Sequence, residues 1–115
     1  RLGVLTGFLD GVLQLVFGAF IFHPIQVVLD YPLPFALLGF AGLFSGQIRL
    51  GILVASVFRW CSHFVSGFVF FAEYAPEGTP VWMYAALYNA SFVFPEDLIC
   101  MVLVPLLLRR LPPYK

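Results

Sequence analysis

The chain has 115 residues, of which 62% are hydrophobic and only 10% are charged, and its mean hydropathy is +0.99. A soluble domain carries about 25% charged residues, so this composition indicates an integral membrane protein and leaves a soluble helical protein as a poor alternative. The formal net charge is zero and the six basic residues are scattered, which excludes a nucleic-acid-binding surface.

The apolar residues fall into four long segments. A helix that crosses the hydrocarbon core of a bilayer, roughly 30 Å thick, needs about 20 mostly apolar residues. The segments that meet this requirement or come close to it cover residues 2–22, 31–45, 50–72 and 81–108. Pro95 lies inside the fourth segment and is predicted to break it. We therefore expect an all-α integral membrane protein, with four transmembrane helices in one domain over residues 1–115.

Glycines recur at every fourth position of the first segment, at Gly3, Gly7 and Gly11. Small residues at this spacing let two helix backbones approach closely within a membrane. The same role is expected of three glycines in the second segment, Gly39, Gly42 and Gly46. The spacing predicts tight helix packing.

The basic residues predict the orientation, because short cytoplasmic loops are enriched in Lys and Arg. If the four segments alternate in direction, one end of the bundle collects Arg1, Arg49, Arg109, Arg110 and Lys115. The opposite end, or its vicinity, collects Asp30, Glu73 and Glu77. Both ends of the chain are predicted to be cytoplasmic. The first residue is not Met and already belongs to an apolar segment, which we interpret as an N-terminal truncation.

Two connections differ in character. Residues 23–34, HPIQVVLDYPLP, are more apolar than an ordinary solvated loop, and their three prolines disfavour one continuous helix. Backbone that leaves helical geometry at membrane depth must be buried in protein or line a watery cavity. We therefore expect residues 23–34 to form a pocket wall. Residues 73–80, EYAPEGTP, are predicted to form an exposed turn or lid.

Ionisable side chains within membrane segments are costly and suggest a function by default. Asp30 lies beside Tyr31 in the proline-interrupted segment, where it can pair with a cationic ligand. A helix cap or a salt bridge to Arg59 is an equally open role for this carboxylate. His63 follows Arg59 by one helical turn and shares its face, so a bond to a neighbouring helix is the simpler role for the imidazole.

The remaining polar groups suggest structural roles. Glu96 and Asp97 follow Pro95, which is typical of the first turn of a helix, and Asp10 is expected to bond across helices. The two cysteines, Cys61 and Cys100, are predicted to be small buried hydrophobes. The tyrosines, tryptophans and phenylalanines near residues 68–88 suit either an interfacial aromatic belt or a cage for a flat or cationic ligand.

The sequence contains no nucleophile and base at productive spacing, no HExxH metal signature and no GxxxxGK[ST] phosphate-binding loop. An intramembrane enzyme is therefore not expected, and neither a cofactor nor a metal is predicted. What remains is an outward-facing pocket with a carboxylate, an imidazole, an amide, phenols and aromatic rings.

These residues resemble the thiamine-specific substrate-binding components of energy-coupling-factor (ECF) transporters, the ThiT or YuaJ family. The matching segments are LDYPLPFALLGFAGLF at residues 29–44, HFVSGFVFFAEYA at 63–75, and YAALYN at 84–89 with the FPE that follows. His63, Tyr84 and Asn89 stand 21 and 5 residues apart, as in the family pattern. The resemblance implies a bundle of six helices, of which this chain would hold four.

The resemblance also implies a binding site. Asp30 stands where the family has an acidic residue that faces the ligand, and Phe71 stands where some members have a Trp that stacks on it. Thiamine has a cationic thiazolium, which a carboxylate neutralises and aromatic rings flank, and an aminopyrimidine that needs donors and acceptors. The residues carried over from the family pattern are Phe20, Asp30, Tyr31, His63, Phe71, Tyr84 and Asn89.

By this resemblance the chain is expected to bind thiamine tightly from the extracellular side of a prokaryotic plasma membrane, without catalysis. The implied partners are the lipid bilayer, an ECF transmembrane coupling protein and two cytoplasmic ATPase subunits. Two alternatives stay open. One is a related component for another vitamin or precursor such as hydroxymethylpyrimidine, a neutral ligand that would not need Asp30. The other is a structural membrane protein without a small ligand.

Overall fold

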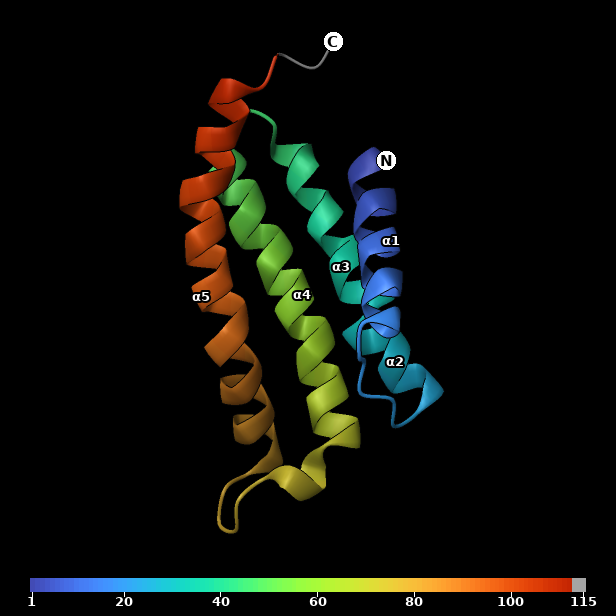
Figure 1. The fold of residues 1–115 in the computed structure, drawn as a ribbon. Coiled ribbons are helices and arrows are strands. Elements are labelled where there is room, and N and C mark those ends of the chain that lie inside the picture. The colour runs from blue at the N-terminus through green and yellow to red at the C-terminus, as the bar shows by residue number, and fades with distance from the viewer. Residues whose placement is uncertain (113–115) are drawn as a thin grey trace.

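The computed structural model describes residues 1–112, and this part of the chain is helical and contains no β-strand. Its elements are α1 (Leu2–Val16), α2 (Pro24–Asp30), α3 (Pro32–Leu38), the 3₁₀ helix η1 (Gly39–Phe44), α4 (Ile48–Phe70), the 3₁₀ helix η2 (Ala72–Tyr74) and α5 (Val81–Arg110). Helices α5, α4, α3 and α1 lie side by side in that order (Figure 1), and α2 precedes α3 toward the end that carries the α4–α5 loop. The all-α prediction is confirmed.

Three stretches of the described chain are long and apolar enough to cross a membrane: residues 24–44, α4 and α5. The remaining α-helix, α1, is apolar but has only 15 residues, fewer than the roughly 20 that a span needs. The first predicted span, residues 2–22, was therefore wrong in its length. The helix that forms there ends at Val16 rather than near Phe22.

The second span begins at Pro24, several residues before the predicted start at Tyr31. Pro24 occupies the first turn of α2, where a missing backbone N–H costs nothing. The His23 side chain caps this helix by accepting a hydrogen bond from the Ile25 amide at 3.1 Å. Pro32 begins α3 in the same way after a kink at Tyr31. The prediction that residues 23–34 do not form one continuous helix is confirmed by the break at Tyr31, although most of the segment is helical because Pro24 and Pro32 each begin a helix.

Helix α5 runs without interruption to Arg110 although it contains Pro95 and Pro105. The prediction that Pro95 breaks the helix was therefore wrong. Membrane helices tolerate proline where other groups satisfy the carbonyl that loses its donor. At Pro105 this is visible, because the Met101 carbonyl one turn earlier accepts from Arg49 Nε at 3.4 Å.

Close backbone contact joins α1 to the α3–η1 segment, in what we call the glycine seam, formed by Gly3, Gly7, Gly11 and Gly39. A Cβ on Gly7 would lie 2.7 Å from the Phe35 carbonyl carbon and nearer still to its oxygen. The prediction of tight packing is confirmed for these glycines. It was wrong for Gly42 and Gly46, where a Cβ would meet nothing within 4 Å.

A polar contact set joins α4 to α5. The buried Ser56 hydroxyl donates to Asp97 Oδ1 at 2.5 Å, and Arg59 Nη1 forms an ion pair with Glu96 Oε2 at 2.7 Å. The Arg59 guanidinium also lies 5.0 Å from the centre of the Phe35 ring on α3. Glu96 and Asp97 therefore sit inside a continuous helix and join two helices, rather than beginning one as predicted.

Two further predictions, for the cysteines and for Asp10, were wrong. An apolar residue such as Cys can lie on the outside of a membrane bundle, because that surface is itself apolar. Cys61 and Cys100 were expected to be buried, but both are exposed on the outside of the bundle. Asp10 is exposed as well, and it makes no hydrogen bond within residues 1–112, so the predicted bond across helices is not formed.

The charged residues separate to the two ends of the bundle as predicted. The first residue of the chain, the start of α4 and the end of α5 lie at one end, which carries Arg1, Arg49, Arg109 and Arg110 (Figure 1). The predicted Lys115 lies outside the described residues. The opposite end carries the exposed α4–α5 loop with Glu73 and Glu77, and Gly78 turns this loop with a φ of +81°. Which end faces the cytoplasm remains a prediction.

Candidate ligand-binding site

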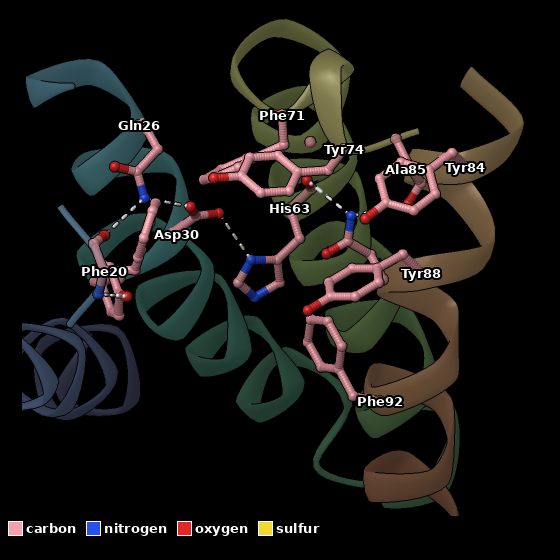
Figure 2. A pocket seen from close by; sticks show the side chains of 13 residues that line it. Phe20, Gln26, Asp30, His63, Phe71, Tyr74, Tyr84, Ala85, Tyr88 and Phe92 are labelled. Atoms are coloured by element: carbon pink, nitrogen blue, oxygen red, sulfur yellow. Dashed lines mark hydrogen bonds and ion pairs between the residues drawn. The ribbon is translucent and has the colours of Figure 1, made fainter. Parts of the chain in front are cut away.

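A cavity of about 480 Å³ opens between α2, α4 and α5 (Figure 2), in the half of the bundle that carries the α4–α5 loop. This size falls in the range of small-molecule sites, roughly 300–1,000 Å³. The cavity is lined by all seven residues singled out from the sequence: Phe20, Asp30, Tyr31, His63, Phe71, Tyr84 and Asn89. The six other lining residues are Gln26, Gly67, Tyr74, Ala85, Tyr88 and Phe92. The segment over residues 23–34 thus forms a pocket wall, as expected.

Asp30 is the carboxylate of this pocket, at the last residue of α2. Its Oδ2 accepts from Gln26 Nε2 at 2.6 Å, and its Oδ1 lies 3.3 Å from His63 Nδ1. Arg59 pairs with Glu96 instead, so the alternative of an Asp30–Arg59 salt bridge was wrong. A carboxylate offers about four acceptor positions, and the side chain is 18% exposed. Asp30 therefore keeps acceptor capacity for a ligand.

His63 comes from the floor of the pocket on α4. Its contact with Asp30 joins α4 to α2, and its ring meets Phe92 of α5 edge-on at 5.5 Å between centroids. The second ring nitrogen, Nε2, is buried without a hydrogen-bond partner in the described chain. An imidazole nitrogen in this position is a donor or an acceptor that a bound molecule can satisfy.

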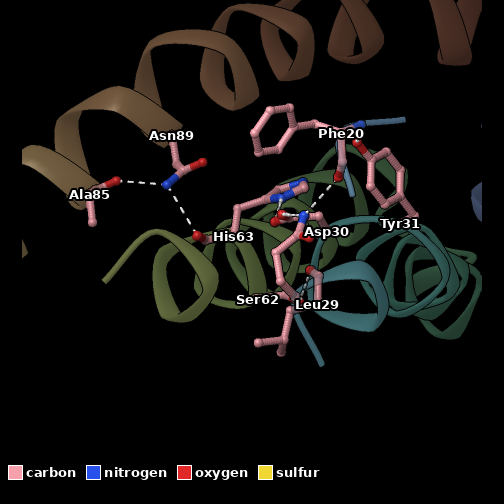
Figure 3. A network of polar contacts seen from close by, with 9 residues as sticks. Phe20, Leu29, Asp30, Tyr31, Ser62, His63, Ala85 and Asn89 are labelled. Carbon is pink, nitrogen blue, oxygen red and sulfur yellow. Dashed lines mark hydrogen bonds and ion pairs between the residues drawn. The ribbon is translucent and has the colours of Figure 1, made fainter. Parts of the chain in front are cut away.

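Asn89 projects from the first half of α5, and two backbone carbonyls fix its orientation (Figure 3). Its Nδ2 donates to the His63 carbonyl at 3.1 Å and to the Ala85 carbonyl at 2.8 Å. Carbonyl oxygens accept only, so the amide nitrogen must face them. The amide oxygen is left as an acceptor at the pocket.

Small residues let α5 approach α4 at this point. A Cβ on Gly67 would lie 3.1 Å from Asn89 Nδ2 and 3.2 Å from the Ala85 methyl group. Contacts of this length are tighter than ordinary van der Waals packing. Gly67 therefore places the Asn89 amide against the α4 backbone.

Aromatic rings form the remaining walls. The Phe71 ring lies 5.8 Å from that of Phe20 and 5.9 Å from that of Tyr74, between centroids, and Tyr84 lies 5.7 Å from Tyr88. These five rings line the pocket, an arrangement compatible with an aromatic cage, and their contact with a ligand stays a prediction. Trp82 and Phe68 do not line it and are exposed on the outside of the bundle, so an interfacial aromatic belt stays the prediction for these two.

Sequence reasoning missed Gln26, the most buried polar side chain of the pocket, with 1% of its surface exposed. A signal for it was present, because residues four apart share one face of a helix and Gln26 precedes Asp30 by four positions. The tight fit of Gly67 and Ala85 against α5 was also missed. A single small residue does not reveal from the sequence which residue of another helix it will contact.

The fold and the site together define a class of protein: a helical membrane protein with a small-molecule pocket between its helices. Within residues 1–112, no cluster of His, Cys, Asp or Glu could hold a metal ion. The whole chain, residues 1–115, matches the family model described as thiamine transporter protein (Thia_YuaJ). The chain belongs to this family, which makes it a transporter protein rather than an enzyme.

Individual relatives agree with this assignment. The chain is 35% identical to the thiamine transporter ThiT of Bacillus subtilis (strain 168), over 97% of this chain and 67% of that protein. It is 31% identical to ThiT of Lacticaseibacillus paracasei, over 96% of this chain and 63% of that protein. The solved structure of ThiT from Listeria monocytogenes has the same fold, with a TM-score of 0.83 at 24% identity, over 93% of this chain and 68% of that one. The chain thus spans about two thirds of the length of these relatives.

Proposed function

We propose that this chain binds thiamine in the pocket between α2, α4 and α5 and serves vitamin uptake across the cell membrane. The observation that carries the proposal is a single carboxylate, Asp30, among aromatic rings in a pocket of small-molecule size. Thiamine is permanently cationic at its thiazolium ring. A carboxylate and ring faces are the groups that stabilise such a cation. The names of the relatives point to the same ligand.

The polar groups of the pocket suit the other half of thiamine, its aminopyrimidine. This ring needs an acceptor for its amino group and partners for its ring nitrogens. The Asn89 amide oxygen is an acceptor, whereas the Tyr84 hydroxyl and His63 Nε2 offer a donor or an acceptor. Leaving a buried polar group without its partner costs about 1–3 kcal/mol, so a pocket of this kind selects ligands with matching groups.

The charge of the pocket favours unphosphorylated thiamine. Neither Lys nor Arg lines the cavity in the described chain. Phosphate groups are usually bound by Arg or Lys side chains or by helix N-termini. We therefore expect thiamine phosphates to bind more weakly than thiamine.

We further propose that the chain acts as the substrate-specific subunit of an ECF transporter, with a transmembrane coupling protein and two cytoplasmic ATPase subunits as partners. Active uptake needs an energy source, and this sequence contains no phosphate-binding loop with which to hold ATP. A separate ATPase would supply it. Co-purification of the full-length protein with coupling and ATPase subunits from its own membranes tests this step.

The proposal for the ligand is tested by calorimetric titration of the full-length protein in detergent with thiamine. Asp30→Asn should weaken binding by roughly 10- to 150-fold, since a hydrogen bond to a charged group contributes about 1.5–3 kcal/mol. Asp10→Asn is the matched control, because Asp10 is exposed and does not line this pocket. It should bind thiamine as the unchanged protein does.

Two other outcomes would replace the proposal. Tighter binding of neutral hydroxymethylpyrimidine, with no effect of Asp30→Asn, would indicate a component for that precursor. Folded full-length protein that binds neither compound would favour a structural membrane protein. The carboxylate decides between these alternatives because only the cationic ligand needs it.

A further inference from the structure

We propose that Gln26 is a positioning residue that sets Asp30 for a cationic ligand and ties it to the segment that closes one side of the pocket. This inference rests on the proposed function and adds a residue to it. The segment is residues 17–23, between α1 and α2. It carries Phe20, which lines the pocket and packs against Phe71. Gln26 belongs to α2 and joins this segment to Asp30 (Figure 2).

The orientation of the Gln26 amide is fixed by its partners. Its Oε1 accepts from the Phe22 backbone amide at 2.9 Å, which leaves Nε2 as the donor end. Nε2 donates to the Phe20 carbonyl at 3.1 Å and to Asp30 Oδ2 at 2.6 Å. Both amide protons and the amide oxygen are therefore used. A flipped amide would set its oxygen against a carboxylate and a carbonyl, so only one orientation is stable.

This arrangement controls the Asp30 carboxylate. One carboxylate oxygen is held by Gln26 and the other faces His63 Nδ1, so the plane of the carboxylate is defined by two helices. Gln26 is 1% exposed, and hydrogen bonds to ionised groups strengthen where water is excluded. A donor at this position keeps the Asp30 carboxylate aimed at the cavity, where a cationic ligand would meet it.

The same amide controls the position of the Phe20 ring. The backbone of residues 20–22 is held by Gln26 at two points, and the Phe20 amide donates to the Tyr31 hydroxyl at 2.8 Å. Tyr31 directly follows Asp30 in the chain. Loss of the Gln26 amide would therefore release the aromatic wall and the carboxylate together.

The test compares thiamine with its neutral pyrimidine half, hydroxymethylpyrimidine, in calorimetric titrations of full-length protein. Gln26→Met keeps the length of the side chain and removes its hydrogen bonds. We expect it to weaken thiamine binding by roughly 10- to 150-fold, the range for one hydrogen bond to a charged group. Binding of the neutral compound should fall by less, so the preference for thiamine should drop. The matched control is Gln14→Met on α1, outside the pocket, which should change neither.

A double-mutant cycle with Asp30→Asn separates positioning from general packing. If Gln26 acts mainly through Asp30, Gln26→Met should weaken binding less than about threefold further once Asp30 is neutral, and that remainder reflects the released Phe20 segment. Equal losses for both ligands, or additive losses in the cycle, would overturn the inference while leaving the thiamine proposal intact. Unchanged binding by Gln26→Met would overturn it too. If the unchanged protein binds no thiamine, the proposed function fails first, and this inference falls with it.

A second variant keeps the test decisive if Gln26→Met does not fold. Gln26→Asn retains an amide but is one methylene shorter, so it cannot reach Asp30 and the Phe22 amide together. The same loss of preference for thiamine is expected. An Asn variant with unchanged preference would contradict the positioning role.

Discussion

Substitution of Gly7 by Ala should destabilise the bundle by opening the glycine seam. The new Cβ would lie 2.7 Å from the Phe35 carbonyl carbon and 3.2 Å from the Ala36 Cα, with the Phe35 oxygen closer still. These are backbone atoms of α3, so no side-chain rotation relieves the clash, and α1 must move away by roughly 1 Å or more to restore ordinary contact distances. Overpacking of this kind costs about 1–3 kcal/mol. We expect the upper part of that range.

The measurement is thermal unfolding of the full-length protein in detergent, followed by circular dichroism. A loss of about 2–3 kcal/mol should lower the midpoint by roughly 5–15 °C. Gly42→Ala is the matched control, because a Cβ at Gly42 meets nothing within 4 Å and its φ is not positive. That variant should stay within about 0.5 kcal/mol of the unchanged protein. Equal midpoints for the two variants would refute the seam as the contact that holds α1 in place.

Three further substitutions test the contacts between α4 and α5. Glu96→Gln leaves the Arg59 guanidinium without its carboxylate and should destabilise by about 1.5–3 kcal/mol; a normal denaturation midpoint would contradict this. Ser56→Ala removes the donor to the buried Asp97 and should cost about 0.6–1.7 kcal/mol, the range of hydrogen bonds between membrane helices, measured in the same way. Asn89→Asp points a carboxylate at two backbone carbonyls, so ligand affinity should fall by tenfold or more in calorimetry, an effect that Asn89→Ala should not exceed.

The pocket could be predicted from the sequence because its chemistry depends on residue types that are rare in membrane helices. Asp30, His63 and Asn89 stand out in an apolar chain, and the spacing of His63, Tyr84 and Asn89 carries the family pattern. The structure brings all three to one cavity. Their role in binding a ligand stays a prediction.

The helix boundaries could not be predicted as well, because proline has two opposite meanings in sequence. Pro24 and Pro32 each occupy the first turn of a helix, whereas Pro95 and Pro105 lie inside one. A helix continues through an internal proline when the carbonyl that loses its N–H partner accepts a hydrogen bond from another donor. The Met101 carbonyl, for example, accepts from Arg49 Nε. Such a partner comes from a distant part of the chain, so local sequence does not reveal it.

Burial was mispredicted for the cysteines because the rule that places them inside comes from soluble proteins. In a bundle whose outside is apolar, large hydrophobic residues such as Leu103 and Val69 are exposed, whereas Ser66 and Asp97 are buried. Polar residues therefore mark the contacts between helices here. Asp97 was assigned to a helix start from its position after Pro95, although its charge alone predicted an interior partner.

The position of the pocket follows from which helices pack against α4. Both α2 and α5 pack against α4 (Figure 1), so the space over the α4 face between them is bounded on two sides. On the α5 side, Gly67 of α4 and Ala85 of α5 bring the two backbones close and place the Asn89 amide at the pocket. On the α2 side, the kink at Tyr31 turns the end of α2, and with it Asp30, toward His63. A close backbone contact on one side and the hydrogen bonds among Gln26, Asp30 and His63 on the other thus fix the polar groups that line the pocket.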